Sequence, residues 1–95
     1  GVAEGISDIP EVFSFSAPTI SRNKTDIGFT LPAATEVALV VYDAIGRLTE
    51  TIISKKFSAG TYSIPVTFDL PAGVYFYNLK AASGENVIKK FLLIE

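Results

Sequence analysis

The residue types that perform most enzyme chemistry are missing from this chain of 95 residues, which has no histidine and no cysteine. It therefore has no imidazole base, no thiolate nucleophile and no zinc site of the usual ligands. The aspartates are dispersed, without the dense oxygen ligands of a calcium loop, and no spacing suggests a Ser/Lys or paired-carboxylate site. Those considered are Asp8, Asp26, Asp43 and Asp69. We expect no enzymatic activity, metal or cofactor, and a function in recognition.

A basic pair followed by apolar residues is the most pointed candidate for recognition. Lys89 and Lys90 precede the run Phe91-Leu92-Leu93-Ile94. Consecutive strand residues face opposite sides, so one lysine must lie toward the apolar side or extend to its rim. Two interpretations are open: at least one lysine docks on a partner, or a lysine protects a sheet edge against strand addition.

Size and composition limit the remaining classes of function. The chain is long enough for one domain, and 48% of its residues are hydrophobic whereas 19% are charged, which excludes a disordered tail. A net charge of −2 with scattered charges predicts no nucleic-acid partner. The apolar runs are far shorter than the ~20 residues that span a bilayer, so we expect no direct membrane insertion. Residues 1–11 are expected to be a linker from a missing N-terminal region, and residues 12–95 the domain.

Strand signals recur about every eight to twelve residues along the domain. Residues 61–69 alternate between polar and apolar side chains, and Pro65 predicts that this strand lies at a sheet edge or is bulged. Residues 27–31 alternate in the same way. Residues 36–42 are apolar on both faces, as in a central strand. Since no segment repeats apolar residues at helical spacing, the pattern indicates an all-β sandwich or barrel.

A polar turn follows the predicted central strand. Asp43 and Gly46 fit a type I turn closed by a glycine with positive φ, with the next strand expected over residues 47–54. Lys55-Lys56 is then expected in a solvated loop before Phe57.

The last 26 residues are predicted to be a β-hairpin, with strands over residues 74–81 and 86–94 and a turn at Gly84. Tyr75 and Tyr77 are expected to face the core with their hydroxyls near its margin. In the last strand each face carries three apolar residues and one lysine. That pattern suits a strand packed on both sides or one that awaits a partner.

Short motifs occur in a set order along residues 12–95 and resemble the C-terminal sorting domain of the type IX secretion system (type A, the Por secretion tail). They are Phe15-Ser16-Ala17-Pro18, Thr25-Asp26-Ile27-Gly28-Phe29-Thr30-Leu31-Pro32, Val41-Tyr42-Asp43-Ala44-Ile45-Gly46-Arg47, Ala59-Gly60-Thr61-Tyr62, Leu70-Pro71-Ala72-Gly73-Val74-Tyr75-Phe76-Tyr77-Asn78-Leu79 and Lys89-Lys90-Phe91-Leu92-Leu93-Ile94. The strings around Tyr42 and Tyr75 are also similar to the immunoglobulin-like domain of flagellar hook-capping proteins.

The resemblance implies an immunoglobulin-like antiparallel β-sandwich of about seven strands. It also implies a bacterial tail that secretion machinery at the outer membrane recognises, and that escorts an N-terminal cargo domain through the periplasm to the cell surface or medium. The matching positions fall into two groups. The structural motif residues are Asp43, Gly46, Gly73, Tyr75 and Gly84; the sorting or recognition residues are Lys89, Lys90, Phe91, Leu92, Leu93 and Ile94.

A structural or adhesive β-sandwich module of an extracellular protein or fibre is the alternative. The two-sided apolar last strand favours it, because an unpaired edge could support self-association. Carbohydrate binding by exposed tyrosines is a third class, which their alternation in the strands disfavours.

Overall fold

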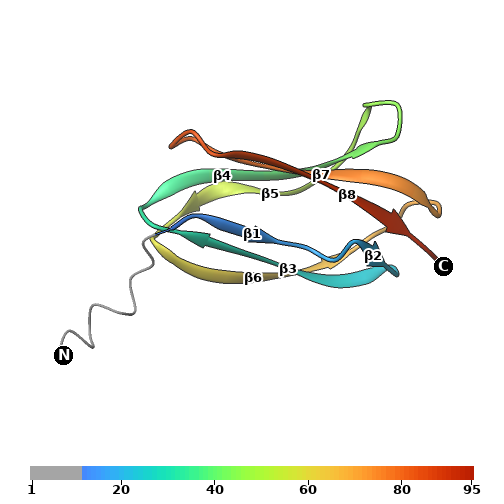
Figure 1. Ribbon diagram of the computed structural model, residues 1–95, viewed down its shortest axis with the longest axis horizontal. Coiled ribbons are helices and arrows are strands. Elements are labelled where there is room, and N and C mark those ends of the chain that lie inside the picture. The colour runs from blue at the N-terminus through green and yellow to red at the C-terminus, as the bar shows by residue number, and fades with distance from the viewer. Residues whose placement is uncertain (1–11) are drawn as a thin grey trace.

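The computed structural model describes residues 12–95, which form two β-sheets packed face to face (Figure 1). The small sheet has the strand order β1-β3-β6, and the large sheet has the order β2-β8-β7-β4-β5. The strands are β1 Ser14–Ser16, β2 Ile20–Ser21, β3 Lys24–Leu31, β4 Thr35–Asp43, β5 Leu48–Phe57, β6 Gly60–Thr67, β7 Gly73–Ala81 and β8 Asn86–Leu93. The predicted immunoglobulin-like sandwich is confirmed. The predicted linker, residues 1–11, lies outside the described residues.

The first strand of the sandwich is divided between the two sheets. β1 pairs with β3 in the small sheet, and the chain then crosses at Pro18 to the large sheet, where β2 runs parallel to β8. Proline lacks an N–H to donate to a ladder, so the crossing falls where pairing is weakest. This division accounts for eight described strands where about seven were predicted.

The core lies between the sheets and is built from alternate residues of the longer strands. In β3, for example, Ile27, Phe29 and Leu31 are buried, while Lys24 and Asp26 on the opposite face are exposed. The buried apolar residues are Phe15, Ile27, Phe29, Leu31, Val37, Leu39, Val41, Phe57, Val66, Phe68, Tyr75, Tyr77, Leu79, Ala81, Phe91 and Leu93. Because β3, β4, β6, β7 and β8 all contribute, hydrophobic burial holds the two sheets together.

Two predictions about strand position are confirmed. β6 lies at the edge of the small sheet, and Pro65 pairs with Asp26 of β3 on one side only. β4 is a central strand of the large sheet, flanked by β7 and β5.

The prediction that Lys55 and Lys56 lie in a loop is wrong, because β5 continues to Phe57. Lys55 pairs with Val37 and Lys56 with Glu36 of β4. Two register shifts interrupt the β4–β5 pairing, and such bulges bend a strand without ending it. Lysines on a bulged edge strand also discourage pairing with another chain. The long ladder with β4 therefore outweighs the local polarity of the lysine pair.

The two tyrosines of β7 face the core as predicted, but only one hydroxyl reaches the margin. Tyr75 Oη donates a hydrogen bond of 2.7 Å to the carbonyl of Pro71. Tyr77 is 0% exposed, and its hydroxyl has no hydrogen-bond partner among the described residues. The prediction is wrong for Tyr77, because the rings of Phe15, Phe68 and Phe91 surround it.

Candidate functional site

Five of the six predicted recognition residues lie on β8, the second strand from one edge of the large sheet, and Ile94 follows that strand directly. β8 pairs with β7 along its whole length, from Asn86 opposite Lys80 to Leu93 opposite Gly73. On its other side β2 covers only the last two residues, with Ile20 opposite Leu92. Beyond that short pairing, no strand of the described chain covers the outer edge of β8. The strand is therefore anchored on one side and largely open on the other.

Two of the predicted recognition residues belong to the core. Phe91 and Leu93 are 1% and 3% exposed. The Phe91 ring stacks on Tyr77 at 3.9 Å between centroids and on Phe68 at 5.4 Å. Burial of side chains of this size contributes roughly 1.5 to 3 kcal/mol each. These residues hold β8 in the sandwich, and a partner cannot reach them while the domain is folded.

Lys89 lies on the core side of β8 and extends to the rim. Its Nζ is 5.9 Å from the centroid of the Phe15 ring, within the range of a cation–π contact. Phe15 in turn packs edge-to-face on Tyr77. The lysine thus covers the gap between the sheets at the open edge, which agrees with the edge-protection interpretation.

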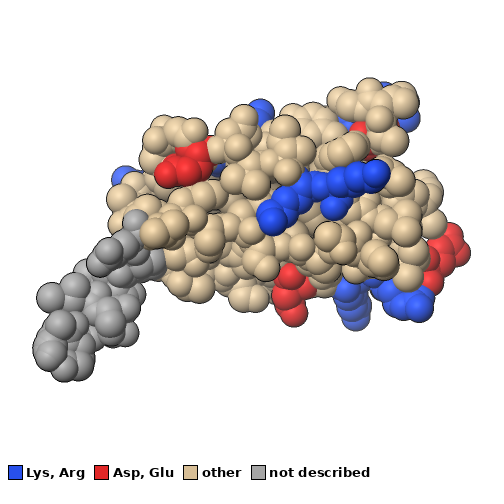
Figure 2. Space-filling model, in the orientation of Figure 1, with Lys and Arg blue, Asp and Glu red and all other residues tan. Residues whose placement is uncertain are grey.

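Lys90 and Leu92 lie on the opposite face of β8, away from the core. Lys90 pairs with Phe76, and Leu92 pairs with both Val74 and Ile20. We call this surface the β8 outer face; it consists of Ile20, Val74, Phe76, Ile88, Lys90 and Leu92. Its aliphatic side chains are exposed, with Ile88 at 64%, Ile20 at 60% and Leu92 at 40%. Figure 2, which views the sandwich from its edge, shows basic side chains close to β8.

Sequence reasoning missed four members of the β8 outer face: Ile20, Val74, Phe76 and Ile88. Because Tyr75 and Tyr77 were expected to face the core, Phe76 between them was expected on the opposite face of β7. Nothing in the sequence indicated that Ile20 would join them, because its pairing with Leu92 brings together residues 72 positions apart. The face is a product of strand order.

Four of the five predicted motif residues meet at one end of the large sheet. Asp43 pairs with Tyr75 across β4 and β7, and Gly73 begins β7. An open hollow of about 280 Å³ is lined by these residues and by the β4–β5 turn. Gly84 lies at the other end of β7, in the turn to β8, with φ of +120°. The structure therefore does not bring it to the others.

The Asp43 carboxylate organises the β4–β5 turn. Its Oδ1 accepts hydrogen bonds from the amides of Arg47 at 2.9 Å and Ile45 at 3.1 Å, and its Oδ2 accepts one from Arg47 Nε at 2.8 Å. The Arg47 amide, the Arg47 guanidinium and the Ile45 amide hold the pKa of Asp43 below its usual value. Gly46 closes the turn with φ of +88°. Both residues have a structural role here.

Gly73 differs from these turn glycines, because its φ lies outside the left-handed region. A Cβ added there would lie 3.8 Å from the Tyr75 ring, an ordinary van der Waals contact. Neither conformation nor space requires glycine at this position.

Two further hollows lie at opposite ends of the large sheet. One, of about 350 Å³, lies at the end of β8 between Leu70, Ala72, Leu93 and Ile94. Arg22 lies at its rim and donates a hydrogen bond to the main-chain oxygen of Glu95. Ile94, also a predicted recognition residue, is half-buried there.

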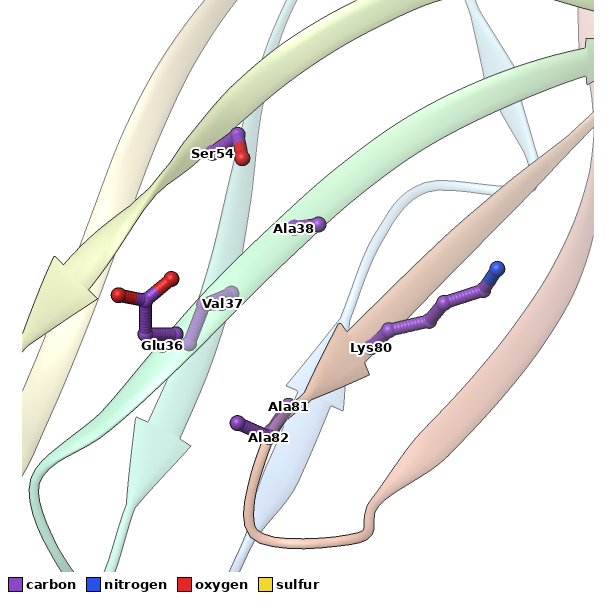
Figure 3. Close-up of a pocket in the computed structure, with 7 residues that line it drawn as sticks. All are labelled: Glu36, Val37, Ala38, Ser54, Lys80, Ala81 and Ala82. Carbon is purple, nitrogen blue, oxygen red and sulfur yellow. The ribbon is translucent and has the colours of Figure 1, made fainter.

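The second hollow, of about 240 Å³, lies at the far end of the large sheet, where Ala38, Ser54 and Ala82 are small (Figure 3). Lys80 extends away from Glu36 and from the other lining residues (Figure 3). Neither hollow places a nucleophile beside a base. Within residues 12–95 no three acidic side chains gather into a group that could hold a metal ion. No helix suited to crossing a membrane occurs in that part of the chain.

These features define an immunoglobulin-like β-sandwich domain whose accessible last strand presents lysines and aliphatic side chains. A family model described as "Secretion system C-terminal sorting domain" matches residues 18–95. The chain belongs to this family, the C-terminal sorting domains of type IX secretion, and the predicted resemblance is confirmed. Domains of this family are sorting signals of secreted proteins and are in general non-catalytic. No curated protein matches the chain.

Proposed function

We propose that this domain directs the export of an N-terminal cargo protein across the outer membrane, from the periplasm to the cell surface or medium. Its membership of the sorting-domain family carries the proposal. In this view residues 1–11 connect the cargo to a folded domain of residues 12–95. The domain acts by binding secretion machinery at the outer membrane and catalyses no reaction.

We assign three separate roles to five of the predicted sorting residues. Phe91 and Leu93 stabilise the folded tail, because both are buried in its core. Lys90 and Leu92 face solvent on the β8 outer face and are available to a partner. Lys89 covers the rim beside Phe15.

A reporter fusion tests the proposed function. The 95-residue chain is placed after a periplasmic reporter in a host that has the secretion system, and the reporter is measured in periplasm, surface and medium fractions. The matched control carries the same chain before the reporter, where a C-terminal signal cannot operate. Export of the first fusion and periplasmic retention of the second are expected. Retention of both contradicts the proposal.

Deletion of residues 89–95 is a poor test of recognition, since it also removes Phe91 and Leu93 from the core. Loss of export would then follow from unfolding alone. Point variants of exposed residues separate the two causes, provided that thermal unfolding shows an intact fold.

A structural or adhesive module is the second candidate, and the open outer edge of β8 favours it, since an unpaired edge can accept a strand of another chain. Light scattering on the 95-residue chain at rising concentration separates the candidates. A fibre-forming or adhesive module is expected to assemble, whereas a sorting tail is expected to remain monomeric.

A further inference from the structure

The outer faces of the two sheets have opposite character. The small sheet presents short hydroxyl side chains, with Thr30 paired with Ser14 on one side and with Thr61 on the other. On the large sheet the β8 outer face presents aliphatic side chains around Lys90. A solvated surface needs no such cluster of exposed aliphatic residues, and clusters of this kind mark interaction sites. Because the exposed aliphatic side chains lie on the large sheet, we infer that this sheet is the binding side of the sandwich.

The charge on the β7 and β8 part of this side is also one-sided. Lys80 and Lys90 project from the outer faces of β7 and β8, and neither strand carries an acidic side chain on that face. Arg22 follows β2 at the rim. The whole chain nevertheless has a net charge of −2. A locally basic face on an acidic chain is complementary to an acidic partner.

A second copy of the chain fits this face poorly. In a two-fold symmetric contact the same surface meets itself, so residues of the face oppose their own copies. Lys90 would then approach another basic face that offers no carboxylate to pair with it. Like charges placed together across an interface oppose association.

A lipid surface and an added strand fit poorly as well. Sites for anionic lipids gather about four to eight basic residues, whereas the β8 outer face has Lys90, with Lys80 and Arg22 beside it. Strand addition at the open edge of β8 is hindered by Lys89, whose side chain lies across the gap between the sheets at Phe15. Inward-pointing lysines discourage pairing at sheet edges. The sheet face, rather than the strand edge, is the available surface.

We propose that the β8 outer face binds an acidic, aliphatic segment of an outer-membrane protein of the export machinery. A carboxylate of that segment pairs with Lys90, and its aliphatic side chains pack on Ile20, Val74 and Leu92. The inference rests on the proposed function and deepens it, because it names the surface and the chemistry of the partner.

The test combines export with site-specific photo-crosslinking of the 95-residue chain in secreting cells. A benzophenone amino acid replaces Ile88 on the β8 outer face or, as a matched control, Ser63 on the outer face of the small sheet. Export is measured for Lys90→Glu, for Lys90→Arg and for Lys24→Glu, which makes the same charge change on the small sheet. All these positions are exposed, so thermal unfolding should change little.

The expected result is an adduct from position 88, but not from 63, with an outer-membrane protein whose crosslinked peptide contains Asp or Glu. Lys90→Glu should lower export about tenfold or more, while Lys90→Arg and Lys24→Glu remain within about twofold of wild type. If wild type is exported and Lys90→Glu is exported equally well, the inference is wrong and the proposed function stands. Adducts from position 88 with a second copy or with lipid also overturn the inference. If wild type is not exported, the proposed function fails and the inference fails with it.

Discussion

The buried hydroxyl of Tyr77 allows a sharp test of the core. Tyr77 is 0% exposed, and its hydroxyl has no partner among the described residues. An unsatisfied buried polar group costs about 1 to 3 kcal/mol. Tyr77→Phe removes this unsatisfied group and keeps the ring stacked on Phe91 at 3.9 Å. The gap left by the oxygen destabilises the variant by about 1 kcal/mol. We expect the variant to be more stable by about 1 kcal/mol.

Tyr75→Phe is the matched control. The change is chemically identical and lies two residues away on the same face of β7, but the Tyr75 hydroxyl donates a 2.7 Å hydrogen bond to Pro71. Its loss should destabilise the domain by about 0.5 to 1.5 kcal/mol. Urea unfolding with an unchanged m-value measures both effects. For a domain of this size, 1 kcal/mol corresponds to a shift of roughly 4 to 8 °C in Tm. Destabilisation by Tyr77→Phe as large as that by Tyr75→Phe would refute the reasoning.

The pH dependence gives an independent measurement of the same hydroxyl. Burial raises the pKa of Tyr77 from 10.0 to about 12. Between these values the unfolded chain releases this proton and the folded chain retains it, so the contribution to stability falls as pH rises. Wild type should therefore lose stability from about pH 10 to about pH 12 more steeply than Tyr77→Phe. Equal slopes would show that Tyr77 titrates normally.

The remaining predictions concern the turns and the open edge. Gly46→Val and Gly84→Val should each lower the free energy of unfolding by about 1 to 3 kcal/mol, because both positions have positive φ. Gly73→Ala should change the free energy of unfolding in urea by no more than about 0.5 kcal/mol. Equal losses of stability at all three positions would contradict the turn assignments. Because the pKa of Asp43 is lowered from 3.8, its contribution to stability is present above that value and is lost as pH falls through the folded-state pKa. Asp43→Asn should remove this dependence of the unfolding temperature on acidic pH. If the variant loses stability with falling pH as steeply as wild type, Asp43 does not make this contribution. Lys89→Thr should increase self-association in light scattering by uncovering Phe15 at the edge, with Lys24→Thr as the control, and a monomeric Lys89→Thr variant would exclude edge protection.

Local patterns in the sequence were sufficient for much of the fold. The alternation around Ile64 and Phe29 predicted half-buried strands, and Pro65 predicted an edge, because side-chain direction and backbone donors are properties of the local chain. The Asp43–Gly46 turn was predictable for the same reason. The family could also be predicted, since its motifs follow one another in a set order.

Local patterns failed where a partner strand decided the outcome. Lys55 and Lys56 look like loop residues, but the ladder with Val37 and Glu36 extends β5 through them. Tyr77 has the same alternation as Tyr75, and only the packing of Phe15, Phe68 and Phe91 around it shows that its hydroxyl is enclosed.

By itself, the sequence determined an all-β sorting domain without the usual catalytic side chains, with Lys89 and Lys90 on opposite faces of its last strand. It left undecided which lysine faces the core, because each face of that strand carries three apolar residues. The tertiary structure decided this, because Phe91 and Leu93 are buried between the sheets. Lys89 shares their face of the strand and therefore lies at the rim beside Phe15, whereas Lys90 lies on the outer face. That face gains Ile20 from a strand far away in the sequence, and such a neighbour follows from strand order, which no local pattern records.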